Sequence, residues 1–348
     1  MPAPDGLRVA VVGATGAVGT VMLRLLRERD FPAAEIVPFA SERSVGRELD
    51  GGLVVAALTE ENVRGFDVAL FSAGATRSRE WARRFADAGA VVVDNSSAFR
   101  MDPGVPLVVS EVNPEALDAH DGIVANPNCT TMVAMLPLKA LHDGFDLRAM
   151  VATSYQAAGG AGQKGIDELA GQVAPLAADV AQLCDDGAAA IAKVGHAVHA
   201  ATLAFNVVPL LGDVGEEGYT DEELKLRDES RKILAIADLA VSPTCVRVPV
   251  MVGHGVAVRA TFDQEVDLGR ALELLRAFPN LVVDDVPTPL AYAGRDEVAV
   301  GRVRRDLADP RSLSFFVVGD NLLKGAALNT VQLAEALLER GLVGTRVS

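Results

Sequence analysis

The first third of the chain shows short apolar runs separated by stretches with helical spacing of apolar residues. The runs predict strands at residues 7–12, 35–39, 68–71, 91–94, 107–109 and 122–125. Helical patterns follow the first run as far as Arg29 and span residues 81–88. Because strands alternate with helices, this pattern predicts an α/β fold with a Rossmann-like, doubly wound parallel sheet over about the first 130 residues.

The pattern changes after Cys129. Longer stretches in which apolar and polar residues alternate predict strands at 148–154, 202–208, 247–252, 255–262 and 313–318. Such alternation is typical of a mixed or antiparallel sheet in an α+β domain. The alanine-rich interval 165–199 has a helical pattern, and we assign no chemistry to it.

A last helix is predicted at residues 328–340, where apolar residues recur three and four positions apart. Its apolar face is expected to return and cover the first domain. The sequence therefore predicts two domains. Residues 1–128 together with the C-terminal segment 326–348 form a nucleotide-binding domain, and residues 129–325 form the second domain.

Composition and charge narrow the class of protein. The 348 residues are 50% hydrophobic and 23% charged, as in ordinary soluble globular proteins. No apolar run approaches the roughly 20 residues of a membrane span, and the N-terminus lacks the pattern of a secretory signal. Three cysteines without a Cys-x-x-Cys pair predict a reducing, cytoplasmic setting. The net charge of −15 argues against nucleic acid or an anionic membrane as partner.

No metal site is predicted. His196 and His199 lie three residues apart, but no carboxylate or third ligand lies close to them in the sequence. We therefore expect both histidines at an exposed helix end.

A glycine pattern, Gly13-x-x-Gly16-x-x-Gly19, follows the first strand and opens a helix. Glycines at this turn let the backbone approach a pyrophosphate, which binds at the helix N-terminus. The sequence thus predicts a dinucleotide site. The residues expected around it are Gly13, Thr15, Gly16, Ala17 and Val18, and then Ser72 and Gly74 in the loop 72–77, which is placed to line the nicotinamide side.

The end of the second strand indicates which cofactor is bound. Sites for NAD usually carry an acidic residue there, whereas Ser41, Arg43 and Ser44 suit a 2′-phosphate and favour NADP. Glu42 opposes this interpretation if its side chain points inward. Asn321, between a strand and the last helix, is placed to bind the nicotinamide carboxamide, although a plain turn explains it nearly as well.

Cys129 ends an apolar run and stands directly before a helical pattern. The free backbone amides and the dipole of a helix N-terminus favour a thiolate there. Its polar neighbours in the run 126–131 are not needed for a buried apolar residue, so we predict a nucleophile. Cys184 and Cys245 are instead expected to be buried as small apolar residues.

Several motifs in one order carry a family resemblance. They are residues 13–19, 126–131, 154–156, Glu222-x-x-Lys225, 247–250, 253–254 and 320–327. From about residue 8 to about residue 340 the chain resembles aspartate-semialdehyde dehydrogenase of the bacterial type. The resemblance implies NADP-dependent, phosphate-requiring interconversion of L-aspartate 4-semialdehyde and 4-aspartyl phosphate, which feeds lysine (through diaminopimelate), threonine and methionine biosynthesis. It also implies a homodimer or a dimer of dimers, with residues 129–325 as catalytic and dimerisation domain.

The resemblance also implies roles for individual residues. Cys129 would be the nucleophile, His254 the acid and base, and Gln156 the group that orients the acyl carbon. Substrate and phosphate would be bound by Arg247, which takes the α-carboxylate, and by Arg100 and Lys225, which take phosphate.

Chemistry adds expectations about the same residues. The amide of Cys129 and the side chain of Asn128 are candidate donors to an oxyanion. Glu222 either steers Lys225, contacts the substrate amine or forms a simple pair on a helix surface. Gly159 and Gly160 permit close approach of nicotinamide or substrate.

The spacing of Arg247 and His254 poses a geometric problem. Seven residues apart on one regular strand, they would point to opposite faces. We therefore predict that Gly253 or Gly255 breaks the strand by a bulge or turn.

Two other functions are compatible with much of this pattern. One is that of an enzyme like N-acetylglutamyl-phosphate reductase, which would use the same cysteine chemistry on a longer substrate. The other is that of a non-catalytic nucleotide-binding paralogue, against which the joint presence of Cys129, Gln156, Arg247 and His254 argues.

Overall fold

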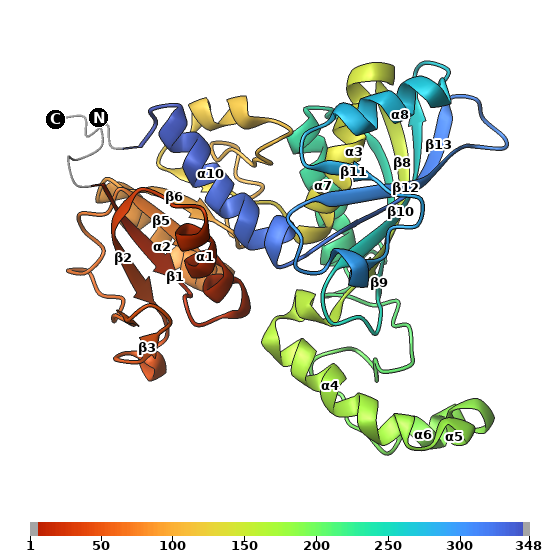
Figure 1. Ribbon diagram of the computed structural model, residues 1–348, viewed down its shortest axis with the longest axis horizontal. Helices are drawn as coiled ribbons and strands as arrows, with labels where there is room; N and C mark the ends of the chain where they lie inside the picture. Colours follow the sequence, from red (N-terminus) through yellow and green to blue (C-terminus); the bar gives the residue numbers. More distant parts are fainter. Residues whose placement is uncertain (1–5, 344–348) are drawn as a thin grey trace. The chain divides into compact units, whose positions relative to one another are not determined.

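The computed structural model describes residues 6–343, and these divide into two compact units (Figure 1). The first unit comprises the chain up to Asn128, residues 232–235 and the segment from Leu323 onward. The second comprises Cys129–Arg231 and Ile236–Leu322.

The first unit is built on a five-stranded sheet in the order β2-β1-β5-β6-β7, with every strand pair parallel. Its strands are β1 (Leu7–Val12), β2 (Ala33–Phe39), β5 (Val68–Phe71), β6 (Val91–Asp94) and β7 (Ile123–Ala125), and its helices are α1 (Ala17–Glu28), α2 (Ala75–Asp87) and α10 (Leu328–Glu339). A small hairpin, β3 (Glu48–Leu49) and β4 (Leu53–Val54), and the short turns η1 (Glu42–Ser44), η2 (Pro114–Ala119) and η4 (Leu323–Ala327) complete it. The predicted doubly wound parallel sheet is confirmed.

Side chains that alternate along the strands bury both faces of this sheet. Val9 and Leu70 lie in a core cluster that α1 and α10 also line. On the opposite face Phe71 packs edge-on against Phe85 of α2, with ring centroids 5.4 Å apart. The predicted return of the last helix onto the first domain is therefore confirmed.

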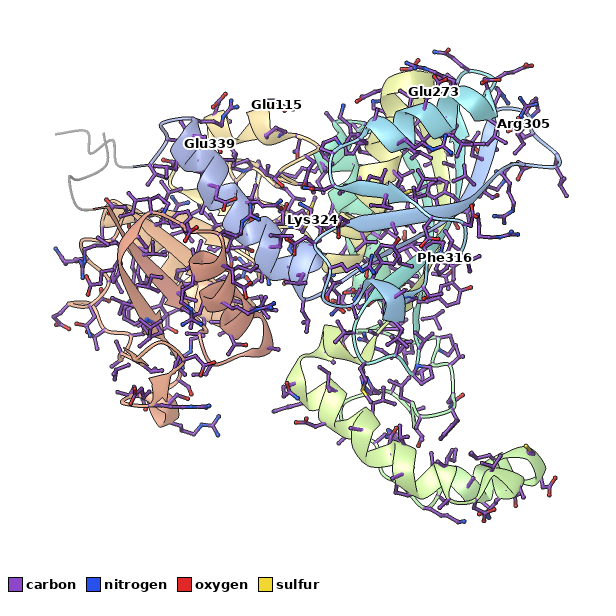
Figure 2. The ribbon with its side chains drawn as sticks, viewed as in Figure 1. Glu115, Glu273, Arg305, Phe316, Lys324 and Glu339 are labelled. Carbon is purple, nitrogen blue, oxygen red and sulfur yellow. The ribbon has the colours of Figure 1, made fainter. Side chains whose placement is uncertain are left out.

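A buried lysine fixes the segment that leads into α10. Figure 2 labels Lys324 in that segment, and its side chain is 0% exposed. The ammonium lies 2.5 Å from Glu111 Oε2 and also donates to Asn329 and Gln332. A charge so deeply buried is tolerated only with such partners, so this cluster holds the C-terminal segment against the sheet.

The second unit contains a six-stranded mixed sheet in the order β11-β12-β13-β10-β8-β9. The pairs β8–β9 and β11–β12 are parallel, and the others are antiparallel. The strands are β8 (Leu147–Gln156), β9 (Ala240–Arg247), β10 (His254–Phe262), β11 (Leu281–Val283), β12 (Val298–Arg305) and β13 (Ser312–Gly319). This is the predicted mixed sheet.

The helices of the second unit are α3 (Cys129–Phe145), α4 (Gln163–Ala177), α5 (Val180–Asp185), α6 (Gly187–Ile191), α7 (Asp221–Leu234), α8 (Leu268–Ala277) and α9 (Pro289–Tyr292), with a 3-10 turn η3 (Ala158–Ala161). The last turn of α7 is counted in the first unit. Helix α3 packs on the central strand β10, and Figure 1 shows α4 to α6 extending away from the sheet of this unit.

Three predicted strands are wrong. At 107–109 only Leu107 forms a bridge, because the Val109 amide donates to the side chain of Asn113 at 2.9 Å and leaves the ladder. At 202–208 the side chain of Gln172 on α4 accepts hydrogen bonds from the backbone amides of Leu203 and Ala204. Only Val208 forms a bridge to a strand there. Residues 248–252 form no strand, since the ladder ends at Arg247.

Three predictions about the interval 165–199, among them a buried Cys184, are also wrong. Its helices end at Ile191, and His199 is buried at 7% exposure instead of lying at an exposed helix end. The carboxylate of Glu168 accepts the backbone amides of residues 197–199 and closes this irregular segment. Cys184 is exposed because α5 lies on the surface, whereas Cys245 is buried as predicted.

Candidate active site

The sulfur of Cys129 lies at the start of a helix and next to a histidine. Cys129 is the first residue of α3, and its Sγ lies 3.2 Å from Nε2 of His254. Free backbone amides at a helix N-terminus stabilise a negative charge. The helix start and the ring nitrogen within hydrogen-bond distance therefore favour a thiolate at Cys129.

Three strands bring the other candidate residues to this sulfur. Parallel pairing sets Gln156, the last residue of β8, opposite Arg247, the last residue of β9. Strand β10 runs antiparallel to β8 and begins at His254, with Gly255 opposite Tyr155. The ends of β8 and β9 and the beginning of β10 thus meet at one edge, next to Cys129.

The predicted break between Arg247 and His254 is confirmed. The two residues lie on strands separated by β8, and residues 248–253 connect these strands without forming a ladder. Gly253 has φ of +96°, and a Cβ there would lie 2.8 Å from the carbonyl oxygen of Pro289. Only glycine fits this turn without strain.

His254 lies in an environment that keeps its ring neutral. The ring is fully buried, and the Ala157 amide donates to its Nδ1 at 3.0 Å. Burial, together with the nearby guanidinium of Arg247, lowers the pKa of His254 to about 3, although a hydrogen bond to the Gly253 backbone favours the charged ring. Because Nδ1 accepts the Ala157 amide, the neutral ring carries its proton on Nε2 and can donate a hydrogen bond from there to the sulfur.

Gln156 and Glu222 form a polar contact at the end of β8. Gln156 is 1% exposed, and its Nε2 lies 3.2 Å from Ser154 Oγ and 3.3 Å from Glu222 Oε1. Lys225 donates to Glu222 at 3.2 Å and to Asp221 at 2.6 Å. Although burial opposes them, these two carboxylates raise the pKa of Lys225, which therefore stays charged. Glu222 therefore contacts both Gln156 and Lys225. Its contact with Lys225 is the pair on one helix that the sequence offered as one alternative.

Arg247 is partly buried and oriented by the backbone. Its Nη1 donates to the Ala157 carbonyl at 2.7 Å. Burial lowers its pKa, whereas the negative charges available at Cys129 and Glu222 oppose the shift. A Cβ on Gly160 would lie 2.7 Å from Nη1, so the glycine leaves room beside the guanidinium.

A cavity of about 310 Å³ lies beside Arg247 in the second unit. His199 and Asp213 contribute its other ionisable side chains, and Leu210 and Leu211 its apolar ones. Burial and the charge of Arg247 lower the pKa of His199. The sequence did not indicate His199 or Asp213 as site residues, because both lie in irregular segments without a motif.

Asn321 and Gly159 lie near the same turn of the second unit. The side chain of Asn321 accepts the Gly253 amide at 2.8 Å, and its Nδ2 would lie 3.6 Å from a Cβ on Gly159. The contact that the structure shows for Asn321 is therefore one that holds a turn. A contact between Asn321 and the nicotinamide carboxamide stays a prediction.

Arg100 and Asn128 are buried in the first unit. Arg100 donates from Nε to the Asn126 carbonyl and from Nη2 to the Asn95 carbonyl, each at 2.9 Å. Asp94 lies nearby, and burial raises its pKa although Ser96, Ser78 and Arg100 act in the opposite direction. The convergence of Arg100 with Lys225 and Arg247 stays a prediction.

The first unit has a cavity of about 270 Å³ where the strand order reverses between β1 and β5. Such switch points bind nucleotides in open parallel sheets. Gly13, Thr15, Gly16, Ser41 and Ser72 line it, as do Ala40, Leu58, Ala73 and Arg77. No motif indicated Leu58, because it lies in an irregular loop.

The glycine pattern of this cavity has a steric reason. Gly13 has φ of +91°, and a Cβ there would lie 2.2 Å from the Ser72 carbonyl oxygen. A Cβ on Gly19 would lie 2.1 Å from the Gly13 carbonyl oxygen. The close approach of β1, β5 and α1 leaves the amides at the start of α1 open to a phosphate.

The other predicted cofactor residues of the first unit do not line this cavity. Ala17 and Val18 form the first turn of α1, and Gly74 immediately precedes α2. Arg43 and Ser44 lie on the exposed turn η1, where Arg43 and Glu42 both face solvent. Arg77, which does line the cavity, is a second basic side chain in reach of a nucleotide phosphate.

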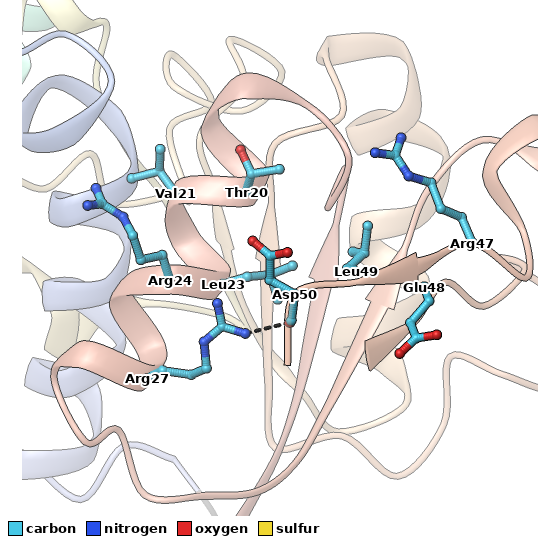
Figure 3. A pocket seen from close by; sticks show the side chains of 9 residues that line it. All are labelled: Thr20, Val21, Leu23, Arg24, Arg27, Arg47, Glu48, Leu49 and Asp50. Atoms are coloured by element: carbon cyan, nitrogen blue, oxygen red, sulfur yellow. Dashed lines mark hydrogen bonds between the residues drawn. The ribbon is translucent and has the colours of Figure 1, made fainter. Parts of the chain in front are cut away.

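A second cavity of the first unit, about 370 Å³, lies between α1 and the hairpin strand β3 (Figure 3). Figure 3 shows Arg24 and Arg27 from α1 and Arg47 from the hairpin side, with Arg27 bonded to the Asp50 carbonyl. None of the predicted site residues lines it. Predicted site residues line instead the cavities at Gly13 and at Arg247.

Metal and membrane features were also searched over residues 6–343. No group of three or more His, Cys, Asp or Glu side chains is placed to hold a metal ion in that range. Within the same range no helix has the length and apolarity that crossing a bilayer requires.

The two units define a class of protein: an oxidoreductase that acts on an aldehyde, with an NAD(P)-binding domain and a Cys–His pair in the other domain. Family models support this class. Residues 8–120 match the semialdehyde dehydrogenase NAD-binding domain, and residues 138–324 match the semialdehyde dehydrogenase dimerisation domain.

Named relatives narrow the class to one family. Aspartate-semialdehyde dehydrogenase of Streptomyces akiyoshiensis is 52% identical over 94% of this chain and 98% of its own. That of Mycolicibacterium smegmatis is 51% identical over 95% and 99%. The crystal structure of aspartate semialdehyde dehydrogenase II from Vibrio cholerae, complexed with ASA, is 40% identical with a TM-score of 0.88, and the match covers 96% of this chain and 98% of that one. The chain belongs to the aspartate-semialdehyde dehydrogenase family.

Proposed function

We propose that the protein reduces 4-aspartyl phosphate to L-aspartate 4-semialdehyde with NADPH, and catalyses the reverse reaction with phosphate, through a thioester on Cys129. The observation that carries this proposal is the 3.2 Å contact between Sγ of Cys129 and Nε2 of His254 at the start of α3. A thiolate suits both directions because it is a strong nucleophile and a good leaving group.

The reductive direction begins when the Cys129 thiolate attacks the acyl carbon. The bond from that carbon to the phosphate oxygen breaks, and phosphate leaves with the electron pair. When bound, NADPH supplies the hydride that reduces the thioester carbonyl. His254 donates a hydrogen bond from Nε2 to the carbonyl oxygen as negative charge develops there. The carbon–sulfur bond then breaks, which releases the aldehyde and regenerates the Cys129 thiolate. We propose the Cys129 amide and the Asn128 side chain as donors to the oxyanion.

Charged side chains bind the two ends of the substrate in this proposal. Arg247 takes the α-carboxylate, since its planar guanidinium is partly buried and held by the Ala157 carbonyl. Gln156 orients the acyl group, and its partner Glu222 is placed to accept the substrate amine. Arg100 and Lys225 bind phosphate.

The nucleotide site is proposed to hold NADP. Gly13, with φ of +91°, leaves the backbone open to a pyrophosphate, and Arg77 lines the same cavity. Ser41 also lines that cavity, and Arg43 and Ser44 follow it on η1. These basic and hydroxyl groups suit a 2′-phosphate. Gly159, Gly160 and Asn321 are proposed to lie on the nicotinamide side.

The wider setting follows from the proposed reaction. Its product would supply lysine, threonine and methionine biosynthesis. Because the matched second domain is described as a dimerisation domain, we propose a homodimer or a dimer of dimers. We propose a cytoplasmic location, because none of the three cysteines forms a disulfide and such cysteine usage suits a reducing compartment.

The decisive assay compares substrates and cofactors in the oxidative direction. Purified protein is given L-aspartate 4-semialdehyde or N-acetylglutamate 5-semialdehyde, with NADP or NAD, with and without phosphate. We expect phosphate-dependent turnover of aspartate semialdehyde with NADP. Preference for the N-acetylated substrate would assign the reductase of that longer compound, and nucleotide binding without turnover of either aldehyde would indicate a non-catalytic paralogue.

A further inference from the structure

We propose that Lys232 is a positioning residue of the phosphate site, because its ammonium holds the turn that carries Arg100. The inference rests on the proposed role of Arg100 in phosphate binding. Lys232 belongs to the first unit, as does the turn at residues 100–105.

The ammonium of Lys232 is surrounded by backbone carbonyls. Its Nζ donates to the carbonyl oxygens of Arg100, Asp102 and Val105 at 2.7, 2.9 and 2.8 Å. An ammonium has three N–H donors, and three carbonyls of one short turn receive them. Without a cation between them, these carbonyl dipoles would repel one another, so the lysine favours this conformation of the turn.

Besides the side chain of Arg100, which donates to the carbonyls of Asn126 and Asn95, two local backbone bonds close the turn. The Asp102 amide donates to the Phe99 carbonyl at 3.0 Å, and the Val105 amide donates to the Asp102 carbonyl at 3.2 Å. Both bonds are local and do not fix the position of the turn. The Lys232 contacts join residues about 130 positions away in the chain and supply that fixed point.

Arg100 is thus held from two sides. Lys232 binds its backbone carbonyl, while the carbonyls of Asn126 and Asn95 receive its Nε and Nη2. The guanidinium is 7% exposed and has one defined orientation. A phosphate binds a pre-oriented guanidinium better than a mobile one, because less side-chain freedom is lost on binding.

The chemistry requires an ammonium at position 232. Three carbonyls converge on a point, which suits a compact tetrahedral donor, whereas the planar fork of arginine directs its donors into one plane. Arg227, on the same helix, makes its hydrogen bonds to the adjacent Asp228 and offers a matched control.

The first experiment measures steady-state constants in the oxidative direction for Lys232→Met, Arg100→Met and Arg227→Met. For Lys232→Met we expect the KM for phosphate to rise about tenfold or more, the effect of disturbing a charged hydrogen bond. The KM for semialdehyde and for NADP should change by less than about twofold, and Arg227→Met should match the wild type. A folded Lys232→Met enzyme with an unchanged phosphate KM would overturn the inference.

The Arg100→Met arm separates this inference from the proposed function. A raised phosphate KM in Arg100→Met with an unchanged one in Lys232→Met overturns only the role of Lys232. An unchanged phosphate KM in Arg100→Met removes Arg100 from the phosphate site and overturns both.

The second experiment tests the ammonium itself and serves also if Lys232→Met folds poorly. Lys232→Ala, refolded and assayed in ammonium chloride, should regain most of its affinity for phosphate. Tetramethylammonium chloride at the same concentration, which has no N–H donors, should not restore it. Equal effects of the two salts would contradict the proposed coordination.

Discussion

The buried histidine makes the stability of the enzyme depend on pH in a predictable direction. His254 is fully buried with a pKa of about 3, whereas a histidine in the unfolded chain titrates near 6.5. Below that value the unfolded chain binds a proton that the folded chain does not. The free energy of unfolding therefore falls as the pH is lowered, by about 1.4 kcal/mol per pH unit. The loss from this one group reaches about 2 kcal/mol near pH 5 and levels off at about 5 kcal/mol as the pH approaches 3.

The variant His254→Gln isolates this contribution, because glutamine does not titrate and the other groups cancel in the comparison. Both proteins are unfolded in urea at several pH values between about 5 and about 7.5. As the pH falls through this range, the free energy of unfolding of the wild type should decrease by about 2 kcal/mol relative to that of the variant. Imidazole resonances of selectively labelled histidine provide a direct check. Parallel stability curves, or a folded-state titration of His254 near 6.5, would refute the reasoning.

Three further substitutions test the substrate and nucleotide sites. Arg247→Lys loses the planar fork and should weaken the semialdehyde complex by about 1.5–3 kcal/mol, seen as a raised KM; an unchanged KM removes Arg247 from the site. Arg43→Ala should lower the ratio of NADP to NAD activity, and an unchanged ratio would transfer the role to the serines or to Arg77. Gly13→Ala should abolish nucleotide binding and destabilise the protein by more than about 2 kcal/mol, because its Cβ would lie 2.2 Å from a backbone oxygen. Gly46→Ala is the control, since φ there is +80° but nothing lies within 4 Å, so only the conformational cost should appear in thermal unfolding.

Local patterns were enough to predict the parallel sheet of the first unit, although not the loop at 107–109, and the position of Cys129 at the start of a helix. The parallel strands are apolar because both faces of their sheet are buried, and this produces an unambiguous run in the sequence. The glycines at 13 and 19 are required by backbone contacts next to their own strand. Cys129 could be placed at a helix start because the helical periodicity begins immediately after it.

The second unit shows where local patterns fail. The spacing of Arg247 and His254 indicated a break, but not that β8 would separate their strands. The apolar run at 202–208 resembles a strand, yet the side chain of Gln172 accepts its amides. Contacts between residues distant in sequence override a pattern of this kind.

Residues from unpatterned segments could not be predicted either. His199 and Asp213 reach the Arg247 cavity from irregular loops, and Lys232 resembles an ordinary charged residue of a helix surface. The contacts of these residues depend on neighbours that are distant in the sequence. For Lys232 these neighbours are three backbone carbonyls about 130 residues away.

The central claim is that the sulfur of Cys129 forms a thioester during turnover. The most direct test mixes the enzyme with 4-aspartyl phosphate without NADPH, quenches the mixture within milliseconds to seconds and maps the modified peptide by mass spectrometry. The account predicts one aspartyl group on Cys129, discharged when NADPH is added, and no such adduct in Cys129→Ser, which still binds the nucleotide. Normal turnover by Cys129→Ser, or an acyl group found on another residue, would contradict it.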